Sequence, residues 1–429
     1  MEATIVIPVW HGEQVILDCL KAVFAHSGEQ LLEVICVDNA SHDASTTLIR
    51  DNFPQVTVLS QPVNLGFAGG VNTGLRAANG DLLILLNQDC MVQSGWLDAL
   101  IEAAAANPAL GIVGAHVLNA DGSVNHAGAY LERPLAYGRH ITNDDKTVPT
   151  SVEYVTGAVF GITRAALDRV GWFDEGFYPA YFEEADYCFR AKRQGFEIGY
   201  VPGATAVHLF SGDEWQTSPV RHNANQHAMR YRFVSKHYTP NELDAFFQAE
   251  ADAVGTEQYY MQAIGRLLGV RQTLQTMPDI LNKREQDLDS PLTPAGQRQL
   301  SVGFTHILHQ AFAAAEKITL LRRPEPPTHL DQSWQEVQNR LQVLQQQEHD
   351  LLTRIYFKPP GSDTDEPTWK RFYRLLVLRP LSFLIGRDYL LLAQLNTIHV
   401  ARFDQMAKMQ RLIERRLTLL ETLTHYEFR

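Results

Sequence analysis

Three carboxylates lie close together in the sequence, at Glu183, Glu184 and Asp186, and aromatic residues surround them. The aromatic neighbours are Tyr178, Tyr181, Phe182 and Phe189. Partly apolar surroundings raise the pKa of a carboxylate, which suits a general base that takes a proton from a hydroxyl group. The alternative is that these acids only stabilise the first turn of a helix, by about 0.3–1 kcal/mol each. Helix stabilisation would account for one or two carboxylates, but not for the aromatic setting.

Asp89 and His208 are candidate metal ligands. Asp89 follows the apolar run Asp81–Asn87, and His208 follows the strand-like run Val201–Val207. Carboxylate oxygen and imidazole nitrogen can hold Mg²⁺ or Mn²⁺, which would neutralise a diphosphate. The alternatives are that Asp89 caps the next helix and that His208 is a structural histidine. The residues alone leave both alternatives open.

Polar residues and glycines follow the other apolar runs. Asp38 ends the run Glu33–Asp38, where its carboxylate could accept hydrogen bonds from a base or a ribose. Gly66, Gly69 and Gly70 could let the backbone approach a ligand, and they open a helix whose N-terminus would attract anions. The alternative is an ordinary turn with a helix cap. Because ligands of open parallel sheets bind beyond the carboxyl ends of the strands, one shared binding edge is predicted.

The elements that must position these residues are short β-branched runs alternating with helical stretches. Strands are expected at Thr4–Val9, Glu33–Asp38, Val56–Ser60, Asp81–Asn87 and Val201–Val207. Helices are expected at Gln14–Phe24, Ser45–Asn52, Gly69–Asn79, Thr163–Val170 and Asp186–Gln194. This alternation predicts an α/β protein built of βαβ units.

The character of the chain changes at Thr239–Glu242, which reads as a capping box with proline at the first helical position. Beyond it the strand signals vanish, and Ser290–Pro294 is one of several proline-rich breaks. We expect a catalytic domain over residues 1–239 and an α-helical accessory region over residues 240–429. The stretch 334–355 predicts either helices packed within one bundle or a dimerising coiled coil. The stretch 368–395 predicts either an interfacial membrane helix or a basic-rimmed packing helix.

The net charge of −12 argues against a general nucleic-acid-binding protein, which would carry a basic excess. The four cysteines form no C-x-x-C pair, so neither a zinc site nor a disulfide framework is expected, and a reducing compartment is the simplest interpretation. We find no membrane-spanning run and no signal-peptide pattern. The expected location is therefore the cytoplasm, with the inner face of the cell membrane as the alternative.

Several segments together resemble the inverting glycosyltransferases of family 2, which have the GT-A fold, and especially their bacterial rhamnosyltransferase-type members. The matching segments include IVIPVWHGEQVILDCLKAV, VICVDNASHDAS, NLGFAGGVNTGLRAANGDLLILLNQD and the stretch TGAVFGITRAALDRVGWFDEGFYPAYFEEADYCFRAKRQGF. They span residues 4–212 in the expected order, about half of the chain. The resemblance implies a GT-A type, Rossmann-like mixed sheet with flanking helices.

The resemblance also implies an activity. A sugar would pass from a nucleotide-diphosphate sugar, such as dTDP-rhamnose or a UDP-sugar, to a hydroxyl of a glycan or a lipid-linked acceptor. The transfer would be a single displacement assisted by Mg²⁺ or Mn²⁺, with Asp89 and His208 as ligands. Glu184 would be the general base, with Glu183 as the second choice. A homo-oligomer is compatible with these features, and no nucleic-acid partner is expected.

The resemblance assigns further residues to the donor and the acceptor. The donor-binding set is Pro8, Trp10, Asp38, Asn39, Asn64, Gly69, Gly70, Asn72, Asn87, Gln88, Asp89 and Arg221, the last in the loop after His208. The acceptor-side set is Trp172, Tyr178 and Asp186. Two positions depart from the family pattern, because Asn87 replaces the first aspartate of the D-x-D motif and Glu184 replaces an aspartate. These departures keep open a second hypothesis, a non-catalytic assembly protein. The run Pro8–Gly12 lacks the basic, glycine-rich loop of a nucleotidyltransferase, which excludes that class.

Overall fold

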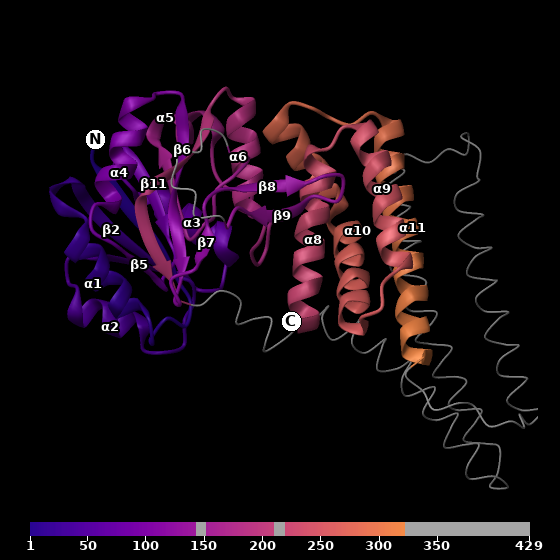
Figure 1. Cartoon of the computed structure of the whole chain (residues 1–429), viewed down its shortest axis with the longest axis horizontal. Coiled ribbons are helices and arrows are strands. Elements are labelled where there is room, and N and C mark those ends of the chain that lie inside the picture. Colours follow the sequence, from indigo (N-terminus) through magenta and orange to yellow (C-terminus); the bar gives the residue numbers. More distant parts are fainter. Residues whose placement is uncertain (143–151, 210–218, 322–429) are drawn as a thin grey trace, which may run out of the picture. The chain divides into compact units, whose positions relative to one another are not determined.

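The computed structural model describes residues 1–142, 152–209 and 219–321, and the chain divides into two compact units, Met1–Ala315 and Glu316–Arg429. The first unit contains a mixed sheet with flanking helices, followed by a group of long helices (Figure 1). The predictions for 334–355 and 368–395 lie outside the described residues. The boundary predicted at residue 239 remains a prediction.

The first half of the sheet is parallel, as the alternation of runs and helices predicted. Its strands are β1 (Ala3–Val9), β2 (Leu31–Asp38), β3 (Thr57–Ser60) and β4 (Leu82–Leu86), in the order β3-β2-β1-β4. The helices between them are α1 (Ile16–His26), α2 (Ser45–Asn52) and α3 (Gly66–Ala77), with a short 3₁₀ turn at Gly28–Gln30. All five residues of β4 are buried, because helices cover both faces of a parallel sheet. The register pairs Val9 with Asp38 and Asp38 with Ser60, so these strands end together.

The second half of the sheet is mixed. Strand β10 (Val159–Thr163) lies antiparallel between β4 and β6 (Leu110–Asn119), and β11 (Glu197–His208) runs parallel to β6. At the far edge, β5 (Cys90–Val92) pairs antiparallel with β11, and β7 (Val124–His126) pairs with the end of β6. Strands β8 (Ala129–Glu132) and β9 (Tyr137–His140) form a separate hairpin. The remaining helices of this part are α4 (Trp96–Ala106), α5 (Arg164–Val170) and α6 (Glu183–Arg193).

The main core lies between the sheet and helices α1 and α4. Apolar side chains of alternate strand positions, such as Ile5, Ile7, Leu82 and Ile84, pack there with fully buried Trp96. This core fixes the strands, and the loops at their carboxyl ends are then free to carry polar groups.

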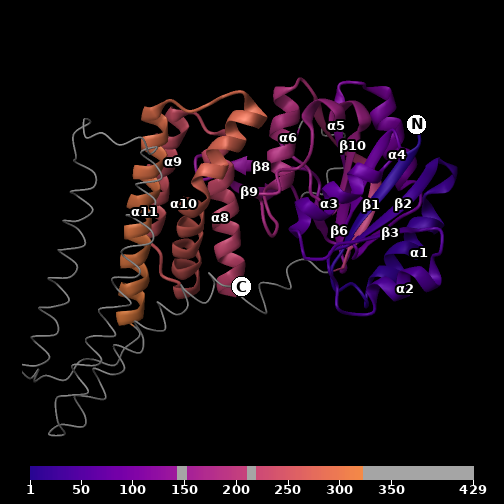
Figure 2. The same cartoon turned by 180° about the vertical axis from the view of Figure 1, so that it is seen from behind.

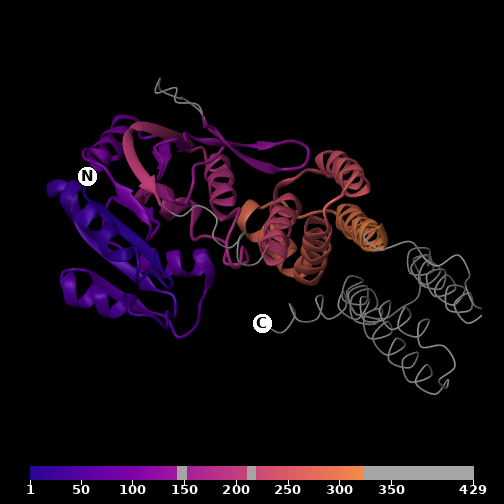
Figure 3. The ribbon, with the colours of Figure 1, turned by 60° about the horizontal axis from the view of Figure 1, so that its bottom comes forward.

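Four long helices follow the sheet. They are α8 (Pro219–His237), α9 (Pro240–Gly255), α10 (Tyr260–Leu288) and α11 (Pro294–Leu321), and they lie side by side (Figures 2 and 3). The capping box is confirmed, since Thr239 and Glu242 exchange side-chain to backbone hydrogen bonds. The break at Ser290–Pro294 is confirmed as the connection between α10 and α11. Among the residues described here, no helix is both long and apolar enough to cross a membrane.

Candidate active site

The pairing of β5 with β11 brings Asp89 and His208 together. The register places His208 opposite Cys90, the residue that follows Asp89. The Nε2 atom of His208 lies 3.2 Å from Oδ1 of Asp89, and both side chains keep about 15% of their surface exposed. The N-terminus of α4 is at Gly95 with no side-chain cap, so Asp89 does not cap that helix. Asp89 is therefore available to a ligand together with His208.

The atoms around this pair fit a hard divalent cation. The side-chain amide of Asn87 lies 3.4 Å from Nε2 of His208, and its oxygen can face the same point if the amide is turned over. Ligand atoms of Asp89, Cys90 and His208 all lie within 4.8 Å of one another. Cys90 is an unsuitable ligand for such an ion, because burial raises the pKa of its thiol and hard cations prefer oxygen. Asp89, His208 and Asn87 form the fitting donor set.

The middle residue of the Asn87-Gln88-Asp89 motif has a different role from the donor contact that we expected. The Gln88 amide donates to the carbonyl of Trp10 and accepts from its N–H, both at 3.0 Å. This pair of hydrogen bonds fixes the backbone just beyond β1. The ring of Trp10 stays 54% exposed at the same edge of the sheet. We therefore assign Gln88 to the positioning of Trp10, and Trp10 keeps its place as a donor-side residue.

Asp38 and Pro8, both predicted on the donor side, lie on the neighbouring strands β2 and β1. Pro8 pairs with Val37 in the sheet, and Asp38 is the next residue of that strand. The Asp38 carboxylate is mostly buried and accepts a hydrogen bond from the N–H of Ser41 at 2.9 Å. That bond shapes the loop after β2 and holds the carboxylate at the edge of the sheet.

The loop before α3 is held by protein contacts, which corrects the predicted roles of Asn39 and the glycines. The Asn39 amide donates to the carbonyl of Gly66 and accepts from Leu65, both at 2.9 Å, so both of its polar ends are used. A Cβ at Gly69 would lie 2.6 Å from Leu65, and a Cβ at Gly70 would lie 3.3 Å from Asn39. These glycines are small because the protein packs against them. Their contact with a donor stays a prediction.

Asn64 and Asn72 also make internal contacts. Asn64 accepts from the N–H of Gly66 at 2.8 Å and so starts the turn into α3. Asn72 is fully buried, donates to the carbonyl of Phe173 at 3.0 Å and accepts from the N–H of the same residue at 2.9 Å. Its buried position excludes direct contact with a donor. Asn72 instead ties α3 to the segment that carries Trp172.

The acidic pair Glu183-Glu184 forms the first turn of α6. The two preceding residues, Tyr181 and Phe182, have positive φ angles of 87° and 69°, a strained conformation for aromatic residues. Oε1 of Glu184 accepts from the N–H of Gly157 at 3.0 Å. Burial raises the pKa of both carboxyls, as the aromatic surroundings predicted, and the neighbouring Glu184 raises that of Glu183 further. Such a carboxylate suits proton transfer.

The two glutamates differ in access. Glu183 is 2% exposed, and its Oε2 atom has no hydrogen-bond partner among the described residues. Glu184 is only partly buried. This difference favours Glu184 as the residue that can meet a substrate hydroxyl.

Two consecutive residues connect the acidic pair to the metal-ligand candidates. The N–H of Gly157 donates to Glu184, and the carbonyl of Ala158 accepts from the N–H of Asn87 at 3.1 Å. The base candidate and the start of the metal motif therefore lie on either side of one short segment, just before β10. Sequence analysis assigned no role to Gly157 and Ala158, because they act through backbone atoms.

The residues predicted on the acceptor side differ in their exposure to solvent. Trp172 and Tyr178 are 43% and 47% exposed, whereas Phe173 and Phe177 between them are buried in the core. The guanidinium of Arg76 lies 5.1 Å from the centre of the Trp172 ring. Trp172 and Tyr178 are thus available for an acceptor.

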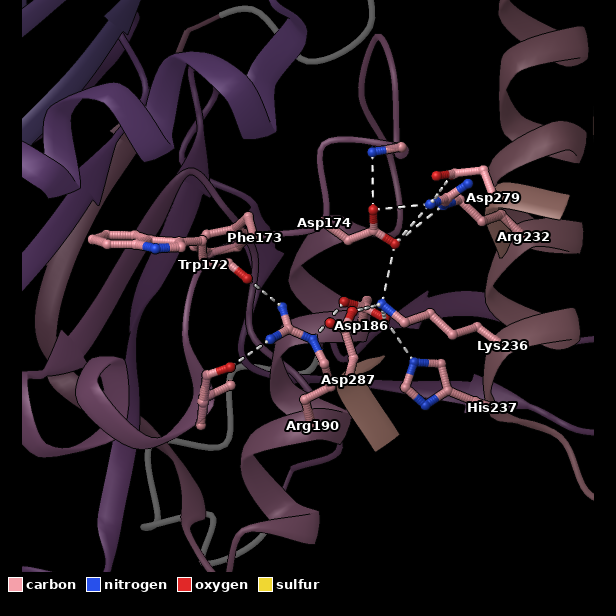
Figure 4. A network of polar contacts seen from close by, with 12 residues as sticks. Trp172, Phe173, Asp174, Asp186, Arg190, Arg232, Lys236, His237, Asp279 and Asp287 are labelled. Atoms are coloured by element: carbon pink, nitrogen blue, oxygen red, sulfur yellow. Dashed lines mark hydrogen bonds and ion pairs between the residues drawn. The ribbon is translucent and has the colours of Figure 1, made fainter. Parts of the chain in front are cut away.

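Asp186 is a correction. It is fully buried, and its carboxylate is bound by Arg190, Lys236 and His237 (Figure 4). The charges of Lys236 and Arg190 and the hydrogen bond with His237 hold the pKa of Asp186 well below its usual range, and the burial of Asp186 leaves no surface for an acceptor. We missed Lys236 in the sequence, because a lysine on a helix is usually a solvent-exposed residue.

Arg221 is placed differently from the prediction. It lies in the first turn of α8 and not in a loop. Its side chain is exposed, so a diphosphate contact stays a proposal.

Known proteins share this sequence pattern and this architecture. Residues 4–171 match the family model described as glycosyl transferase family 2. The N-acetylglucosaminyl-diphospho-decaprenol L-rhamnosyltransferase of Mycobacterium tuberculosis is 25% identical over 250 residues, which cover 52% of this chain and 81% of that protein. The pre-mycofactocin glycosyltransferase of the same species is 29% identical over 184 residues, covering 41% of this chain and 37% of that protein.

A solved structure supports the fold. The crystal structure of GalNAc-T7 with UDP, GalNAc and Mn²⁺ matches with a TM-score of 0.50 at 15% identity, covering 77% of this chain and 59% of that chain. At this identity the likeness concerns the fold alone. Together with the matching segment and the curated relatives, it shows that the N-terminal part of this chain is a family 2 glycosyltransferase domain with the GT-A fold, which makes the chain a glycosyltransferase.

Proposed function

We propose that this chain transfers a sugar from a nucleotide-diphosphate sugar to a hydroxyl group of a glycan or a lipid-linked acceptor, with inversion of the anomeric centre. One observation carries the proposal. The pair Asp89–His208, with Asn87 beside it, is connected to Glu184 through the dipeptide Gly157-Ala158. The proposed diphosphate site and the proposed base would then flank one short segment, which suits a displacement between two substrates.

The donor proposed first is dTDP-rhamnose, with UDP-sugars as the second choice. The relative from M. tuberculosis is named as an L-rhamnosyltransferase acting on a diphospho-decaprenol-linked sugar, which supports a deoxyhexose donor and a lipid-linked acceptor. GalNAc-T7 was crystallised with UDP and Mn²⁺, which supports a nucleoside diphosphate with a divalent cation. A lipid-linked acceptor would bring the reaction to the inner face of the cell membrane.

In the proposed site, Asp89 and His208 would hold Mg²⁺ or Mn²⁺. When bound, the cation would neutralise the diphosphate and make it a better leaving group. Trp10, Pro8 and Asp38 would bind the nucleoside, and Arg221 would approach the diphosphate from the start of α8. Residues 1–239 would form the catalytic domain and residues 240–429 the accessory region.

The reaction itself depends on Glu184. Its carboxylate takes the proton of the acceptor hydroxyl as the oxygen attacks the anomeric carbon from the side opposite the diphosphate. The new glycosidic bond forms while the bond between the anomeric carbon and the diphosphate oxygen breaks, and the nucleoside diphosphate leaves. Burial keeps the pKa of Glu184 raised, which makes the carboxylate a stronger base than an exposed glutamate. Trp172 and Tyr178 would present flat apolar faces to the acceptor sugar.

A screen of nucleoside diphosphates and nucleotide sugars tests the proposal. The melting temperature of the full chain is measured with each compound, with and without Mn²⁺. We expect stabilisation by one nucleoside diphosphate that requires the cation. Compounds that bind are then tested as donors by mass spectrometry of the sugar product, with lipid-linked and free glycosides as acceptors. Absence of cation-dependent binding by every compound, together with absence of transfer, would refute the proposed function.

A further inference from the structure

One buried lysine contacts three carboxylates. The Nζ atom of Lys236 lies 3.1 Å from Oδ2 of Asp174, 2.8 Å from Oδ1 of Asp186 and 2.6 Å from Oδ2 of Asp287 (Figure 4). Lys236, Asp174 and Asp186 are fully or almost fully buried, and Asp287 is only slightly exposed. An ammonium group has three N–H donors, so its hydrogen-bonding capacity matches these three partners.

The three carboxylates come from three different parts of the chain. Asp174 belongs to the segment between Trp172 and Tyr178, the two exposed aromatic residues of the acceptor side. Asp186 lies in the first turn of α6, the helix that begins with Glu183-Glu184. Asp287 lies in the last turn of α10. Lys236, in α8, therefore joins the acceptor-side segment, the base-bearing helix and the long helices at one point.

Neighbouring basic side chains and His237 reinforce the same connection. Arg190 of α6 donates to Asp186 and to the carbonyl of Trp172, both at 2.9 Å. Arg232 of α8 makes two hydrogen bonds of 2.9 Å to Asp174. His237 lies 2.8 Å from the Asp186 carboxylate. Arg190 thus connects α6 to the segment that begins at Trp172. Arg232 and His237 connect that segment and α6 to α8.

The charges explain why the ammonium is needed. Carboxylate oxygens of Asp174 and Asp186 lie within 4.8 Å of each other. The two negative charges would repel each other at this distance in a buried, low-dielectric environment. The ammonium group of Lys236 forms an ion pair with each of them, and these two attractions offset the repulsion. Without it, the segment after Trp172 and the start of α6 would lose the group that sets their spacing. Glu184 is two residues from Asp186, and Trp172 is two residues from Asp174. A displacement of either carboxylate would therefore move Glu184 or Trp172 as well.

We propose that Lys236 is a positioning residue that sets the distance between the acceptor-side segment and the helix bearing the base. This inference rests on the proposed function, in which Glu184 is the base and Trp172 and Tyr178 receive the acceptor. Lys236 touches no substrate. It acts through Asp174 and Asp186, and it makes the long helices α8 and α10 part of the support of the active site.

The test compares Lys236→Met and Lys236→Arg in the full chain with the donor and acceptor found for the wild type. Because misplacement by about 1 Å can cost about 100-fold in rate, we expect Lys236→Met to lower kcat at least about 10-fold and to raise the KM for the acceptor. The Kd of the nucleoside diphosphate with Mn²⁺ should stay within about 2-fold, since the carboxylate partners of Lys236 are Asp174, Asp186 and Asp287 and not the donor-side residues Asp38, Asp89 and His208. Lys236→Arg, which restores the charge, should recover part of kcat.

Glu250→Gln is the matched control. Glu250 of α9 is also fully buried and accepts from Arg230 of α8 at 2.7 Å and from Arg266 of α10. This cluster is a comparable buried ion group on the same helix, but its hydrogen bonds and ion pairs within the described residues go to Leu135, His227, Tyr231 and Glu257 and not to α6 or the segment after Trp172. Kinetics are compared at equal folded fraction, measured by circular dichroism. We expect Glu250→Gln to lower stability and to leave kcat within about 2-fold of the wild type.

Three results would overturn the inference. They are an unchanged kcat in folded Lys236→Met, an equal loss of kcat in Glu250→Gln, and a parallel loss of donor binding in Lys236→Met. If Lys236→Met does not fold, Asp287→Asn removes one partner of the ammonium, and an unchanged kcat and acceptor KM in that variant would also overturn it. Failure of the proposed function is a separate result, because the wild type itself would then show no transfer.

Discussion

The imidazole of His208 lies 3.2 Å from the carboxylate of Asp89, although β11 and the turn after β4 are far apart in the sequence. The contact depends on the antiparallel pairing of β5 with β11. It brings a carboxylate oxygen from the turn after β4 and an imidazole nitrogen from the end of β11 to one place, where both can reach the same divalent cation. Two such ligands leave most of the coordination sphere of a divalent cation to the diphosphate and to water.

Asp89→Ala should abolish cation-dependent donor binding. Asp89 is the charged ligand candidate at this site among the described residues, so its loss is expected to lower affinity for the nucleoside diphosphate with Mn²⁺ by about 100-fold or more. Isothermal titration calorimetry with and without Mn²⁺ measures this loss. Asp121→Asn, a change in the exposed turn after β6, is the control and should bind normally. Unchanged affinity in Asp89→Ala would remove Asp89 from the metal site.

Glu184→Gln should separate binding from chemistry. The amide keeps the size of the side chain but cannot take a proton, so kcat should fall by about 100- to 10,000-fold while the Kd of the donor nucleotide stays the same. The rate of product formation gives kcat, and isothermal titration calorimetry gives the Kd of the donor nucleotide. Glu183→Gln distinguishes the two glutamates, because Glu183 is almost inaccessible and its variant should retain most of kcat. A reversed pattern, with transfer lost only in Glu183→Gln, would make Glu183 the base.

Glu183 should make the folded protein less stable as the pH rises. Burial and the neighbouring Glu184 raise the pKa of Glu183, so the folded state keeps a proton that the unfolded chain releases. The free energy of unfolding should therefore fall as the pH rises from the usual glutamate pKa through the raised one. Urea unfolding of the wild type and of Glu183→Gln over pH 4–8 measures this, and the variant should lose part of the slope and gain about 1–3 kcal/mol at neutral pH. Equal slopes would show that Glu183 ionises normally in the fold.

Asn72→Ala should destabilise the protein by about 1–3 kcal/mol, because it leaves the buried N–H and carbonyl of Phe173 without partners. Thermal or urea unfolding measures the loss. Asn52→Ala on the exposed end of α2 removes a hydrogen bond of similar length to the carbonyl of Leu48, and it should cost less than about 0.5 kcal/mol. Normal stability with weakened donor binding in Asn72→Ala would instead restore Asn72 to the donor site.

Local patterns predicted the parallel half of the sheet well. The runs ending at Val9 and Asp38 became β1 and β2, and the helix at Ser45–Asn52 has the predicted bounds. These elements can be predicted because the spacing of apolar residues along the sequence indicates which segments form strands or helices and which of their faces are buried. The antiparallel insertion of β10 between β4 and β6 was not foreseen, because strand order is set by contacts between distant segments.

Sequence analysis identified residues of the candidate site better than it identified what each of them contacts. Asp89 and His208 proved to be neighbours, and burial raises the pKa of Glu184, in the expected direction. Asn39, Asn72 and Asp186 instead contact the protein itself. A polar residue in a matching motif looks the same in sequence whether it binds a ligand or a backbone. Only its burial and its partners distinguish the two cases.

The pairing of β11 with β6 is irregular between Val201 and Thr205, whereas the residues from Thr205 to His208 pair with β6 in unbroken register and those from Ala206 to His208 also pair with β5. A strand alternates its side chains between two faces, so one residue added within Thr205–Val207 would turn His208 away from Asp89. The irregular stretch before Thr205 can absorb such a change, since the register there is already interrupted. During divergence of this enzyme, insertions and deletions in β11 should therefore accumulate before Thr205 and be eliminated after it.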